Sequence, residues 1–393
     1  MKHYNTVVIG CGGIGSAACY WLSRRGGSVL GIEQFGLGHV SGGSQDHSRI
    51  IRLAQHQRAY SVLAPHAYEA WSVVEAQSGV QVVLKTGGLV IEDTEGRETE
   101  RVGDRNVAGY VRAFEEQGVD FDLLSAQALM ARWPQFRLRG HESAIYQKDS
   151  GIVDARRANA VHVALARAGG VDFLTETAVT ALTPVGGQVE VVTPQQRFLA
   201  DHVIVTSGAW TNRVLHATGV SLPLTVTQEQ VTYYATPNLR EFAPDKFPVF
   251  MWHGAHNFYG FPVYGEVATK LGQHMGGHEV TAETRSFTPD PVREARQRTF
   301  LSQTIPGFLG PELYSKTCLY TVPPDQNFVL DTLPETPQIS VAIGAGHAYK
   351  FAGLLGRILA ELALEGGSSF PIDTFSVSRP AITDPAFPKA FHA

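Results

Sequence analysis

The chain has 393 residues, of which 44% are hydrophobic and 18% charged, and its formal net charge is −5. This length and apolar content can bury a sizeable core and predict two intertwined domains. The small acidic excess gives no reason to expect nucleic acid or an anionic membrane as a partner, so a small molecule is the expected ligand. Three scattered cysteines, Cys11, Cys19 and Cys318, argue against a disulfide framework and indicate a reducing compartment.

The apolar N-terminal run VVIGCGGIGSAACYWL invites interpretation as a signal-peptide core or a membrane span. Its glycines, its shortness for a bilayer and the acidic Glu33 after a second apolar run argue against both. No lipidation signal or repeat is found, and the final FHA is unlike a peroxisomal address. We therefore expect a cytoplasmic protein.

The chain opens with a predicted βαβ unit: a strand over 5–10, a helix over 12–25 and a strand over 28–33. The first turn, Gly10-Cys11-Gly12-Gly13-Ile14-Gly15, has the G-x-G-x-x-G spacing, and Glu33 follows at the end of the second strand. Such glycines let the backbone approach a pyrophosphate at a helix N-terminus, and the carboxylate accepts from ribose hydroxyls. The pattern predicts dinucleotide binding, and because Glu33 would repel a 2′-phosphate, FAD or NAD is expected rather than NADP.

Two later segments favour FAD. Residues 203–210 (VIVTSGAW) and 339–346 (ISVAIGAG) each run from an apolar strand into small residues, as expected where a chain passes close to a cofactor. The second is followed by a predicted helix over 349–364, whose N-terminus could face an anion or a flavin carbonyl.

The intervening segments differ in character. Residues 86–150 are more polar, and 226–317 carry alternating stretches such as TQEQVTYYAT that predict antiparallel strands. We therefore expect an α/β, two-domain fold with a Rossmann-like FAD-binding domain, discontinuous in sequence, and an interleaved antiparallel-sheet substrate domain. The FAD-binding domain should comprise residues 1–85, 151–225 and 318–393, and the substrate domain residues 86–150 and 226–317.

Several segments, in order from end to end, carry a family resemblance. They are the glycine turn with Glu33, SRIIR (48–52), YGFP (259–262), KLGQH (270–274), CLYTVPPD (318–325), GHAYKF (346–351) and FSVSRPAI (375–382). Together they resemble monomeric sarcosine oxidase and its N-methyltryptophan oxidase relatives, FAD-dependent amine oxidoreductases of the D-amino-acid-oxidase-like superfamily. The resemblance implies a monomeric oxidase that takes a small amino acid and O2.

Cys318 acquires a role from the resemblance, because in that family the cysteine of the C-L-Y-T segment forms a thioether to the flavin 8α-methyl. The addition needs a thiolate, and Lys316, on the same face if the segment is a strand, would favour it. Without the matched segment, a lone cysteine is more often a small buried hydrophobe. Cys11 and Cys19 are assigned to packing.

Arg49 and Arg52 lie three residues apart and would be neighbours if the segment is helical. Arginines so placed normally satisfy backbone carbonyls or surface acids. The resemblance implies instead that Arg49 lies against the flavin and that Arg52 and Lys350 bind the substrate carboxylate. The cofactor-binding set it implies is Gly10, Gly12, Gly15, Glu33, Ser44, Arg49, Val179, Gly208, Cys318, Gly346 and Lys350.

Lys270 by itself would be an ordinary solvated lysine. By resemblance it lies beside flavin N5, where a cation stabilises the superoxide formed when O2 takes its first electron. His274 matches a family histidine near the substrate amine, and Tyr259 and Tyr320 match active-site tyrosines, although an aromatic in a sheet is often core. The H-x3-H spacing of His274 and His278 suggests a metal, but Met-Gly-Gly between them breaks a helix and no further ligands complete a site, so none is expected.

Three departures from the family pattern fall near the expected flavin and substrate face. Residues 45–47 are Gln-Asp-His where relatives show a His-Gly stretch, GEVATK (265–270) lacks glycine-rich character, and the GAGH turn (344–347) is one residue shorter. Trp252 and His253 would add bulk or a hydrogen bond if they line the pocket. These differences leave the identity of the amine open.

We therefore expect an FAD-dependent oxidase of secondary, N-methyl amino acids, which oxidises the C–N bond to an imine that hydrolyses, while O2 becomes hydrogen peroxide. One alternative is an oxidase of a cyclic imino acid, such as pipecolate or proline, or of a biosynthetic intermediate. Another is a flavin-binding regulatory protein without turnover. The joint presence of Lys270, Arg52, Lys350 and Cys318 speaks against this last alternative.

Overall fold

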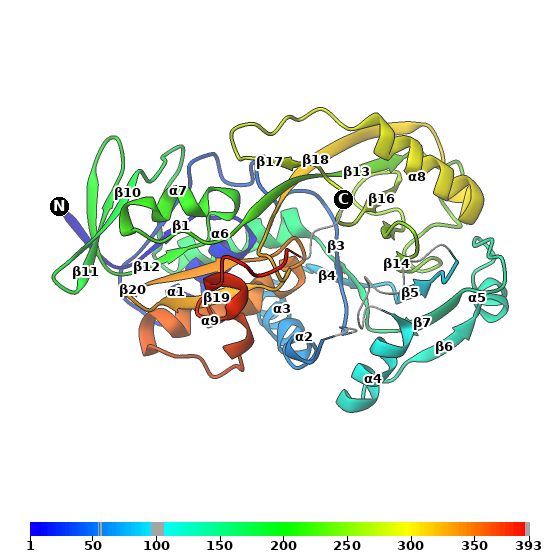
Figure 1. The fold of residues 1–393 in the computed structure, drawn as a ribbon, viewed down its shortest axis with the longest axis horizontal. Helices are drawn as coiled ribbons and strands as arrows, with labels where there is room; N and C mark the ends of the chain where they lie inside the picture. Colours follow the sequence, from blue (N-terminus) through cyan, green and yellow to red (C-terminus); the bar gives the residue numbers. More distant parts are fainter. Residues whose placement is uncertain (54, 56, 96–105, 390–393) are drawn as a thin grey trace.

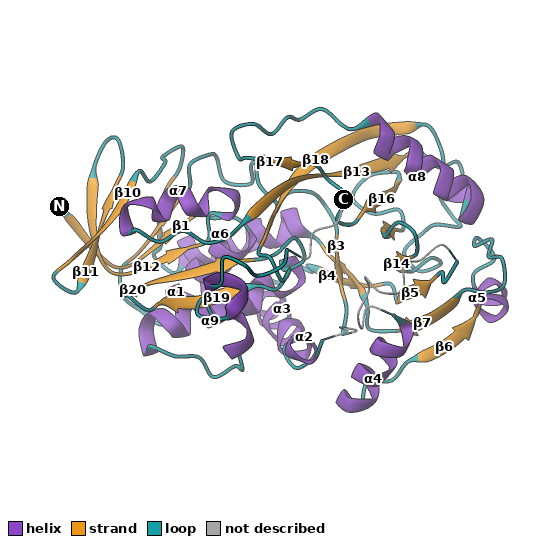
Figure 2. Ribbon diagram, viewed as in Figure 1, coloured by secondary structure: helices purple, strands orange, loops and turns teal. Residues whose placement is uncertain are grey.

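The computed structural model describes residues 1–53, 55, 57–95 and 106–389. This part of the chain forms two regions that lie side by side along the long axis of the molecule (Figure 1). One region is built on an eight-stranded sheet and the other on a nine-stranded sheet, with a small three-stranded sheet between them. Most of the long helices cover the first region, whereas strands and loops dominate the second (Figure 2).

The eight-stranded sheet is centred on the N-terminal strand. Its order is β10 (Ala181–Val185), β11 (Gln188–Val192), β12 (Arg197–Val205), β1 (Lys2–Ile9), β2 (Val29–Ile32) and β9 (Asp172–Leu174), with β20 (Thr336–Ile343) beside β12 and β19 (Val329–Leu333) beside β20. Strand β1 pairs in parallel with both β12 and β2. Val7, Val8 and Ile9 are buried, as expected for a parallel strand that is covered on both faces. The predicted βαβ opening is confirmed, with α1 at Gly13–Ser23.

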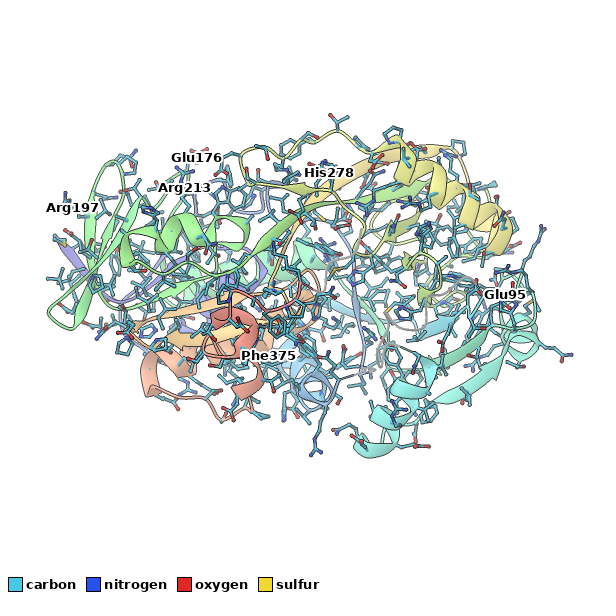
Figure 3. All side chains as sticks on the ribbon, viewed as in Figure 1. Glu95, Glu176, Arg197, Arg213, His278 and Phe375 are labelled. Atoms are coloured by element: carbon cyan, nitrogen blue, oxygen red, sulfur yellow. The ribbon has the colours of Figure 1, made fainter. Side chains whose placement is uncertain are left out.

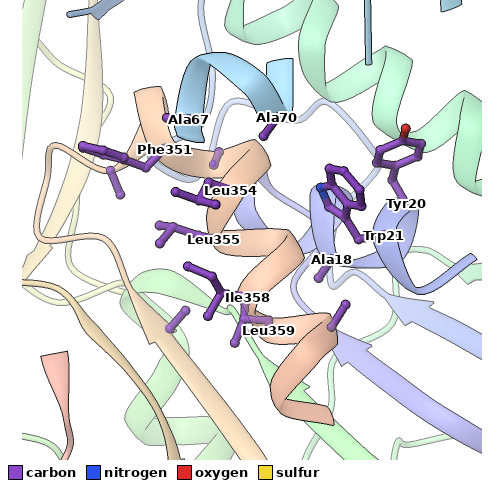
Figure 4. Close-up of a cluster of buried hydrophobic side chains, with 14 of the residues drawn as sticks. Ala18, Tyr20, Trp21, Ala67, Ala70, Phe351, Leu354, Leu355, Ile358 and Leu359 are labelled. Carbon is purple, nitrogen blue, oxygen red and sulfur yellow. The ribbon is translucent and has the colours of Figure 1, made fainter. Parts of the chain in front are cut away.

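Three helices form the cover on one face of this sheet. The helix α9 (Ala352–Glu365) packs against α1 and α3 (Ala64–Ser78), and Figure 4 shows it lying beside Ala18 of α1 and Ala67 and Ala70 of α3. The buried members on α9 include Leu354, Leu355, Ile358 and Leu359. Helices α1 and α9 approach closely because Gly356 has no Cβ, which would lie 2.5 Å from the backbone of Ala17.

The nine-stranded sheet is mainly antiparallel. Its order is β17 (Glu279–Val280), β13 (Thr225–Tyr234), β16 (Thr269–Gln273), β15 (Phe258–Phe261), β14 (Val249–His253), β5 (Gly88–Glu92), β7 (Ser143–Gln147) and β6 (Asp122–Ser125), and β18 (Glu312–Val322) pairs with β13. The pair β14/β5 is parallel. The alternating stretch that begins at Thr227 forms part of β13, as predicted. Helix α8 (Pro291–Thr304) packs beside β16.

The remaining elements connect these layers. The small sheet consists of β3 (Arg49–Ile51), β8 (Gly151–Val153) and β4 (Val83–Lys85). The other α-helices are α2 (Arg58–Ser61), α4 (Val107–Gln117), α5 (Ala126–Arg132), α6 (Ala155–Ala168), α7 (Thr211–Leu215) and α10 (Pro380–Thr383). The 3-10 segments are η2 (Gly208–Trp210), η3 (His216–Thr218), η4 (Pro306–Phe308), η5 (Tyr349–Phe351) and η6 (Asp373–Phe375).

The predicted α/β class is confirmed, and the two sheets interleave along the chain as expected. The predicted boundary at residue 318 falls within β18, whose residues belong to the nine-stranded sheet, and the exact division into domains stays a prediction. Arg197 and Glu95 mark the two ends of the molecule (Figure 3). Among the described residues, no helix is both long enough and apolar enough to cross a membrane.

Candidate active site

A cavity of about 960 Å³ lies between the two large sheets. Its lining includes Gly10 after β1 and Gly208 after β12 on one side, and Tyr259 on β15 and Cys318 on β18 on the other. The volume is at the upper end for a small-molecule site. It is therefore large enough for a large ligand. It lies where the carboxyl ends of parallel strands meet, which is the usual place for a nucleotide in such a sheet.

The glycine turn forms one end of the cavity. Gly10 has a φ of +89°, and a Cβ there would lie 2.8 Å from Ser207 Cα. Gly12 caps α1, whose first turn carries no acidic residue, and the Gly13 amide donates to Ser44 Oγ at 2.9 Å. Gly10, Gly12 and Ser44 line the cavity, as predicted. An open helix N-terminus without acidic side chains suits a phosphate.

Gly15 has a different place from the other two glycines of the pattern. It does not line the cavity, since a Cβ there would lie 1.9 Å from Gly10 O and 2.5 Å from Thr206 Oγ1. Its role is to let α1 pack closely on the strand ends. It supports the cradle from behind rather than facing a ligand.

Glu33 lies at the end of β2 and is buried at the wall of the cavity. Its carboxylate accepts hydrogen bonds from the backbone amides of Cys11 at 2.9 Å and Phe35 at 3.1 Å, and His39 Nε2 lies 3.4 Å away. The carboxylate is thereby fixed beside the glycine turn, in the position that suits ribose hydroxyls.

Later parts of the chain complete the cavity beside the glycine turn, since a Cβ on Gly13 would lie 2.7 Å from the ring of Tyr349. Val179 and Gly208 line the cavity, and so does the turn that contains Gly346, whose φ is +75°. A Cβ on Gly346 would lie 2.3 Å from the ring of Tyr320, so the turn can approach that ring only as glycine. The predicted helix after this turn begins with η5 and continues as α9.

The segment SRIIR is a strand, not the helix that would have brought Arg49 and Arg52 together. Ile50 and Ile51 are β-branched, and the segment pairs with β8 in the small sheet. Arg49 donates to the carbonyls of Ser48, Gly43 and Gln45, so it ties down the loop before β3. Burial acts to lower its pKa, but the acidic groups around it, with Asp46 first among them, together outweigh this and the pKa is raised. Both arginines still line the cavity.

Arg52 and Lys350 form a cationic corner. Arg52 Nη1 donates to Tyr110 OH at 3.1 Å, and its guanidinium lies 5.4 Å from the centre of that ring. Lys350 is 7% exposed and its Nζ donates to His347 O at 2.6 Å. Burial, together with the charge of Arg52, lowers the pKa of Lys350 well below its ordinary value. Two basic side chains at one corner of the cavity define a place for an anionic group of a ligand.

Tyr110 was missed by the sequence reasoning. It lies on α4, in a polar segment without a recognisable motif, and only the fold brings it to Arg52. His253 also lines the cavity, and its ring stacks on Tyr110 at 6.2 Å. Trp252 does not line it: its side chain is buried in the core against Phe300, because adjacent residues of a strand point to opposite faces.

Four predicted residues gather at the sheet wall. His274, after β16, lies 6.4 Å from the ring of Tyr259 and 5.9 Å from that of Tyr320, measured between ring centres. Cys318 lies on β18, and all four line the cavity. Burial raises the pKa of both tyrosines, so their hydroxyls stay protonated.

The Cys318 thiol differs from the expectation. Burial raises its pKa to about 11, and the cations that oppose this are Arg49 and Lys270. Lys316 was expected to favour the thiolate, but its Nζ lies 3.5 Å from Asp46, whose carboxylate draws it to the charge cluster described next. The prediction that Lys316 favours the thiolate is therefore wrong, since Arg49 and Lys270 are the cations that act on the thiol.

Lys270 is buried behind the cavity wall instead of being solvated. It is 1% exposed, its Nζ lies 2.6 Å from Asp46 Oδ2, and it donates to Ser48 O at 2.9 Å and Ser48 Oγ at 3.0 Å. Asp46 itself lines the cavity. The sequence drew attention to Asp46, because residues 45–47 (Gln-Asp-His) differ from the family pattern. It did not indicate that Asp46 pairs with Lys270.

No group of three or more side chains suited to a metal is found within residues 1–53, 55, 57–95 and 106–389.

The cavity combines a glycine cradle at a helix N-terminus, a fixed carboxylate and a length that spans both sheets. These features fit a dinucleotide with a second ring system, as FAD has, and the cationic corner leaves room for a small anionic substrate.

Fold and cavity define a dinucleotide-binding oxidoreductase of the Rossmann type. A family model described as FAD dependent oxidoreductase matches residues 5–362. The chain belongs to this family, and the sequence resemblance is confirmed. It is 31% identical over 390 residues to monomeric sarcosine oxidase of Arthrobacter sp., covering 97% of each chain, and 28% identical over 382 residues to N-methyl-L-tryptophan oxidase of Salmonella arizonae, covering 96% of this chain and 99% of the relative.

Among solved structures, the fold is similar to NikD, an unusual amino acid oxidase essential for nikkomycin biosynthesis. The TM-score is 0.84 at 24% identity, with 96% of this chain and 98% of that chain covered. At this identity the likeness supports the fold, and the substrate has to be argued from the cavity.

Proposed function

We propose that the protein is an FAD-dependent oxidase of secondary, N-methyl amino acids. The observation that carries this proposal is the pair of cations, Arg52 and Lys350, on the wall of the cavity that also contains the glycine cradle. A small amino acid presents a single carboxylate, and such a pair neutralises and orients it. The relatives named as sarcosine oxidase and N-methyl-L-tryptophan oxidase support an N-methylated substrate.

The cationic corner is arranged before a substrate arrives. Tyr110 holds the guanidinium of Arg52, and His347 O holds the ammonium of Lys350. An incoming carboxylate would raise the lowered pKa of Lys350, because an opposite charge favours the protonated form. With the carboxylate fixed, the amine and its carbon are directed toward the ring-lined part of the cavity around His274.

Bound FAD would supply the redox chemistry by accepting a hydride equivalent from the C–N carbon and giving electrons to O2, which yields hydrogen peroxide. We assign His274 to the substrate amine, which it would hold in its neutral form. Tyr259 and Tyr320 would exclude water and frame the amine. Lys270 would provide a fixed positive charge on the flavin side. The imine product hydrolyses to formaldehyde and a primary amino acid.

A substrate panel tests the activity. The purified protein is incubated with sarcosine, other N-methyl amino acids, proline, pipecolate and glycine, and peroxide and formaldehyde are both measured. Equal amounts of the two products from an N-methyl amino acid are expected. Peroxide only with proline or pipecolate would shift the assignment to a cyclic imino acid. Flavin reduction without peroxide would reject the oxidase assignment and indicate a dehydrogenase.

We further propose that FAD is attached through Cys318. This cysteine lines the cavity near Arg49, which opposes the burial-driven rise of its pKa, and a bound flavin would bring the electrophile that the thiolate needs. The protein is precipitated with acid, and the peptide containing Cys318 is analysed by mass spectrometry. Flavin that stays on that peptide is expected. Release of all FAD with an unmodified peptide would reject the attachment.

Three broader assignments accompany this function: the predicted domain division, a monomer and a cytoplasmic location. The interleaved sheets support the domain division, and the three unpaired, buried cysteines support a reducing compartment such as the cytoplasm. The relative named monomeric sarcosine oxidase supports a monomer. Size-exclusion chromatography with light scattering tests the oligomeric state, since a monomer would give the 42.7 kDa of the chain.

A further inference from the structure

Asp46 is a buried carboxylate at the cavity wall to which the proposed function gives no role. Its φ of +90° lies in the left-handed region, which aspartate and asparagine tolerate better than most residues with a side chain. Tyr233 OH donates a hydrogen bond of 2.6 Å to Oδ1, and the Arg156 amide donates to the Asp46 carbonyl at 3.0 Å. These two hydrogen bonds fix Asp46 in an unusual backbone conformation.

Three cations surround this carboxylate. Lys270 Nζ lies 2.6 Å from Oδ2, Arg49 Nη1 lies 3.8 Å from Oδ2, and Lys316 Nζ lies 3.5 Å from Oδ1. Burial acts to raise the pKa of Asp46, but Lys270 and Arg49 outweigh it and hold the pKa well below the usual range. Asp46 is therefore ionised at any pH where the protein would work, and it carries the negative charge on which the cluster depends.

Lys270 is the member of this cluster that loses its proton most readily. Burial lowers its pKa to about 8, Asp46 opposes that shift, and Arg49 adds to it. Arginine does not lose its proton in proteins. If the negative charge of Asp46 were removed, the group that would lose its proton more readily is therefore Lys270. The titratable and charged groups that face Lys270 or its partner carboxylate are Asp46, Arg49, Tyr233, Lys316 and Cys318.

We propose that Asp46 is a positioning residue that keeps Lys270 in its charged form, so that a fixed cation stands on the flavin side of the cavity when O2 is reduced. The proposal rests on the proposed function for its consequence, although the state of Lys270 can be measured without turnover. The pair transfers no proton or electron in this account. Its contribution is electrostatic, through a charge held in place before the reaction.

Asp46→Asn is the decisive substitution. Asparagine keeps the shape, can accept the hydrogen bond from Tyr233 and tolerates the positive φ, so the loop should fold unchanged while the negative charge is lost. Tyr233→Phe is the matched control, since it removes the hydrogen bond to the same carboxylate and leaves the charge. Asp46→Glu tests whether a carboxylate from a longer side chain restores the effect.

The first measurement is direct. The chain has eight lysines, so the holoenzyme labelled with 13C at lysine Cε gives few resonances, and Lys270→Met identifies the one of interest. In the parent protein this resonance should titrate near pH 8. Asp46→Asn should lower the midpoint by about one pH unit or more, because the nearest opposite charge is removed, and Tyr233→Phe should lower it far less. An unchanged midpoint in Asp46→Asn overturns the proposal.

The second measurement follows reoxidation of the reduced flavin by O2 in a stopped-flow instrument. Reduction with dithionite makes this independent of any amine substrate, so a failure of the proposed substrate class leaves the test intact. The rate constant should fall about tenfold for each pH unit above the midpoint of Lys270, and Asp46→Asn should move this fall to lower pH. If the midpoint of Lys270 moves and the oxygen reaction does not, the role assigned to Asp46 is wrong.

Discussion

Glu229 on β13 lies directly opposite Cys318 on β18 in the antiparallel ladder, and the guanidinium of Arg293 holds the Glu229 carboxylate at 2.8 Å. Both members of this ion pair are buried. Glu229 adds to the burial effect that raises the pKa of the Cys318 thiol. Arg293 also donates to the carbonyl of Gln273, the residue before His274, so the pair links the cysteine strand to the histidine loop.

The first prediction concerns the stability of this pair. Glu229→Gln leaves the buried Arg293 without an opposite charge and should lower the free energy of unfolding by about 3–5 kcal/mol. Adding Arg293→Met to that variant should recover part of the loss, because neither charge is then left alone. Urea unfolding of the two single variants and the double variant measures the coupling. Strictly additive losses would contradict a coupled pair.

The second prediction concerns the cationic corner. Arg52→Lys should raise KM for an amino-acid substrate by about 10- to 100-fold, because a charged hydrogen bond contributes about 1.5–3 kcal/mol and lysine cannot make the bidentate contact. Arg197→Lys, at an exposed position at one end of the molecule (Figure 3), is the control and should leave KM unchanged. For an amine substrate without a carboxylate, neither substitution should change KM. An equal rise in KM for that amine in Arg52→Lys would exclude recognition of the carboxylate by Arg52.

The third prediction concerns the back of the glycine cradle. Gly15→Ala would place a Cβ 1.9 Å from Gly10 O, so α1 must move away from the strand ends. We expect a lower melting temperature and weaker FAD retention. Gly367→Ala meets no atom within 4 Å and should behave as the parent protein. Flavin absorbance after gel filtration reports the difference, and full retention in Gly15→Ala would show that the close packing is dispensable.

The fourth prediction concerns acid stability. His162 is buried between Tyr20 and Trp71, and burial lowers its pKa to about 3. The unfolded chain takes up a proton near pH 6.5 and the folded protein does not, so stability should fall as the pH drops from about 6.5 toward 3, by about 1.4 kcal/mol for each unit. His162→Phe keeps the aromatic stack and should flatten this part of the profile.

The control for this profile is His278→Gln, because that histidine is exposed and its substitution should leave the slope unchanged (Figure 3). Urea midpoints at pH 5 and pH 7 are sufficient. If His162→Phe keeps the full loss between these pH values, other groups control the acid stability.

Local patterns predicted the βαβ opening correctly, because the glycine turn and the apolar run act within about thirty residues. The strand after the turn ends at Ile32, beside the Glu33 that the spacing had selected. The cavity position of Cys318 follows the family resemblance, whose matched segment includes this cysteine. Such features depend on contacts close in the sequence or on the resemblance.

Contacts between residues far apart in the chain could not be predicted from sequence patterns. The spacing of Arg49 and Arg52 is compatible with a helix, and only pairing with β8 makes it a strand. The charge cluster joins Asp46 to Lys270, and the corner joins Arg52 to Tyr110, across long stretches of chain. No local signal encodes these contacts, because each arises where the two sheets meet.

The position of the turn at Gly344–Lys350 has a consequence for how the protein is made. Residues 344–350 line the same cavity as Gly10, and Tyr349 lies against Gly13, so two distant parts of the chain must meet before the site exists. A ribosome exposes residues from the N-terminus onward. The nascent chain therefore cannot form the complete site until residues 344–350 have emerged, so capture of the cofactor follows the synthesis of most of the chain.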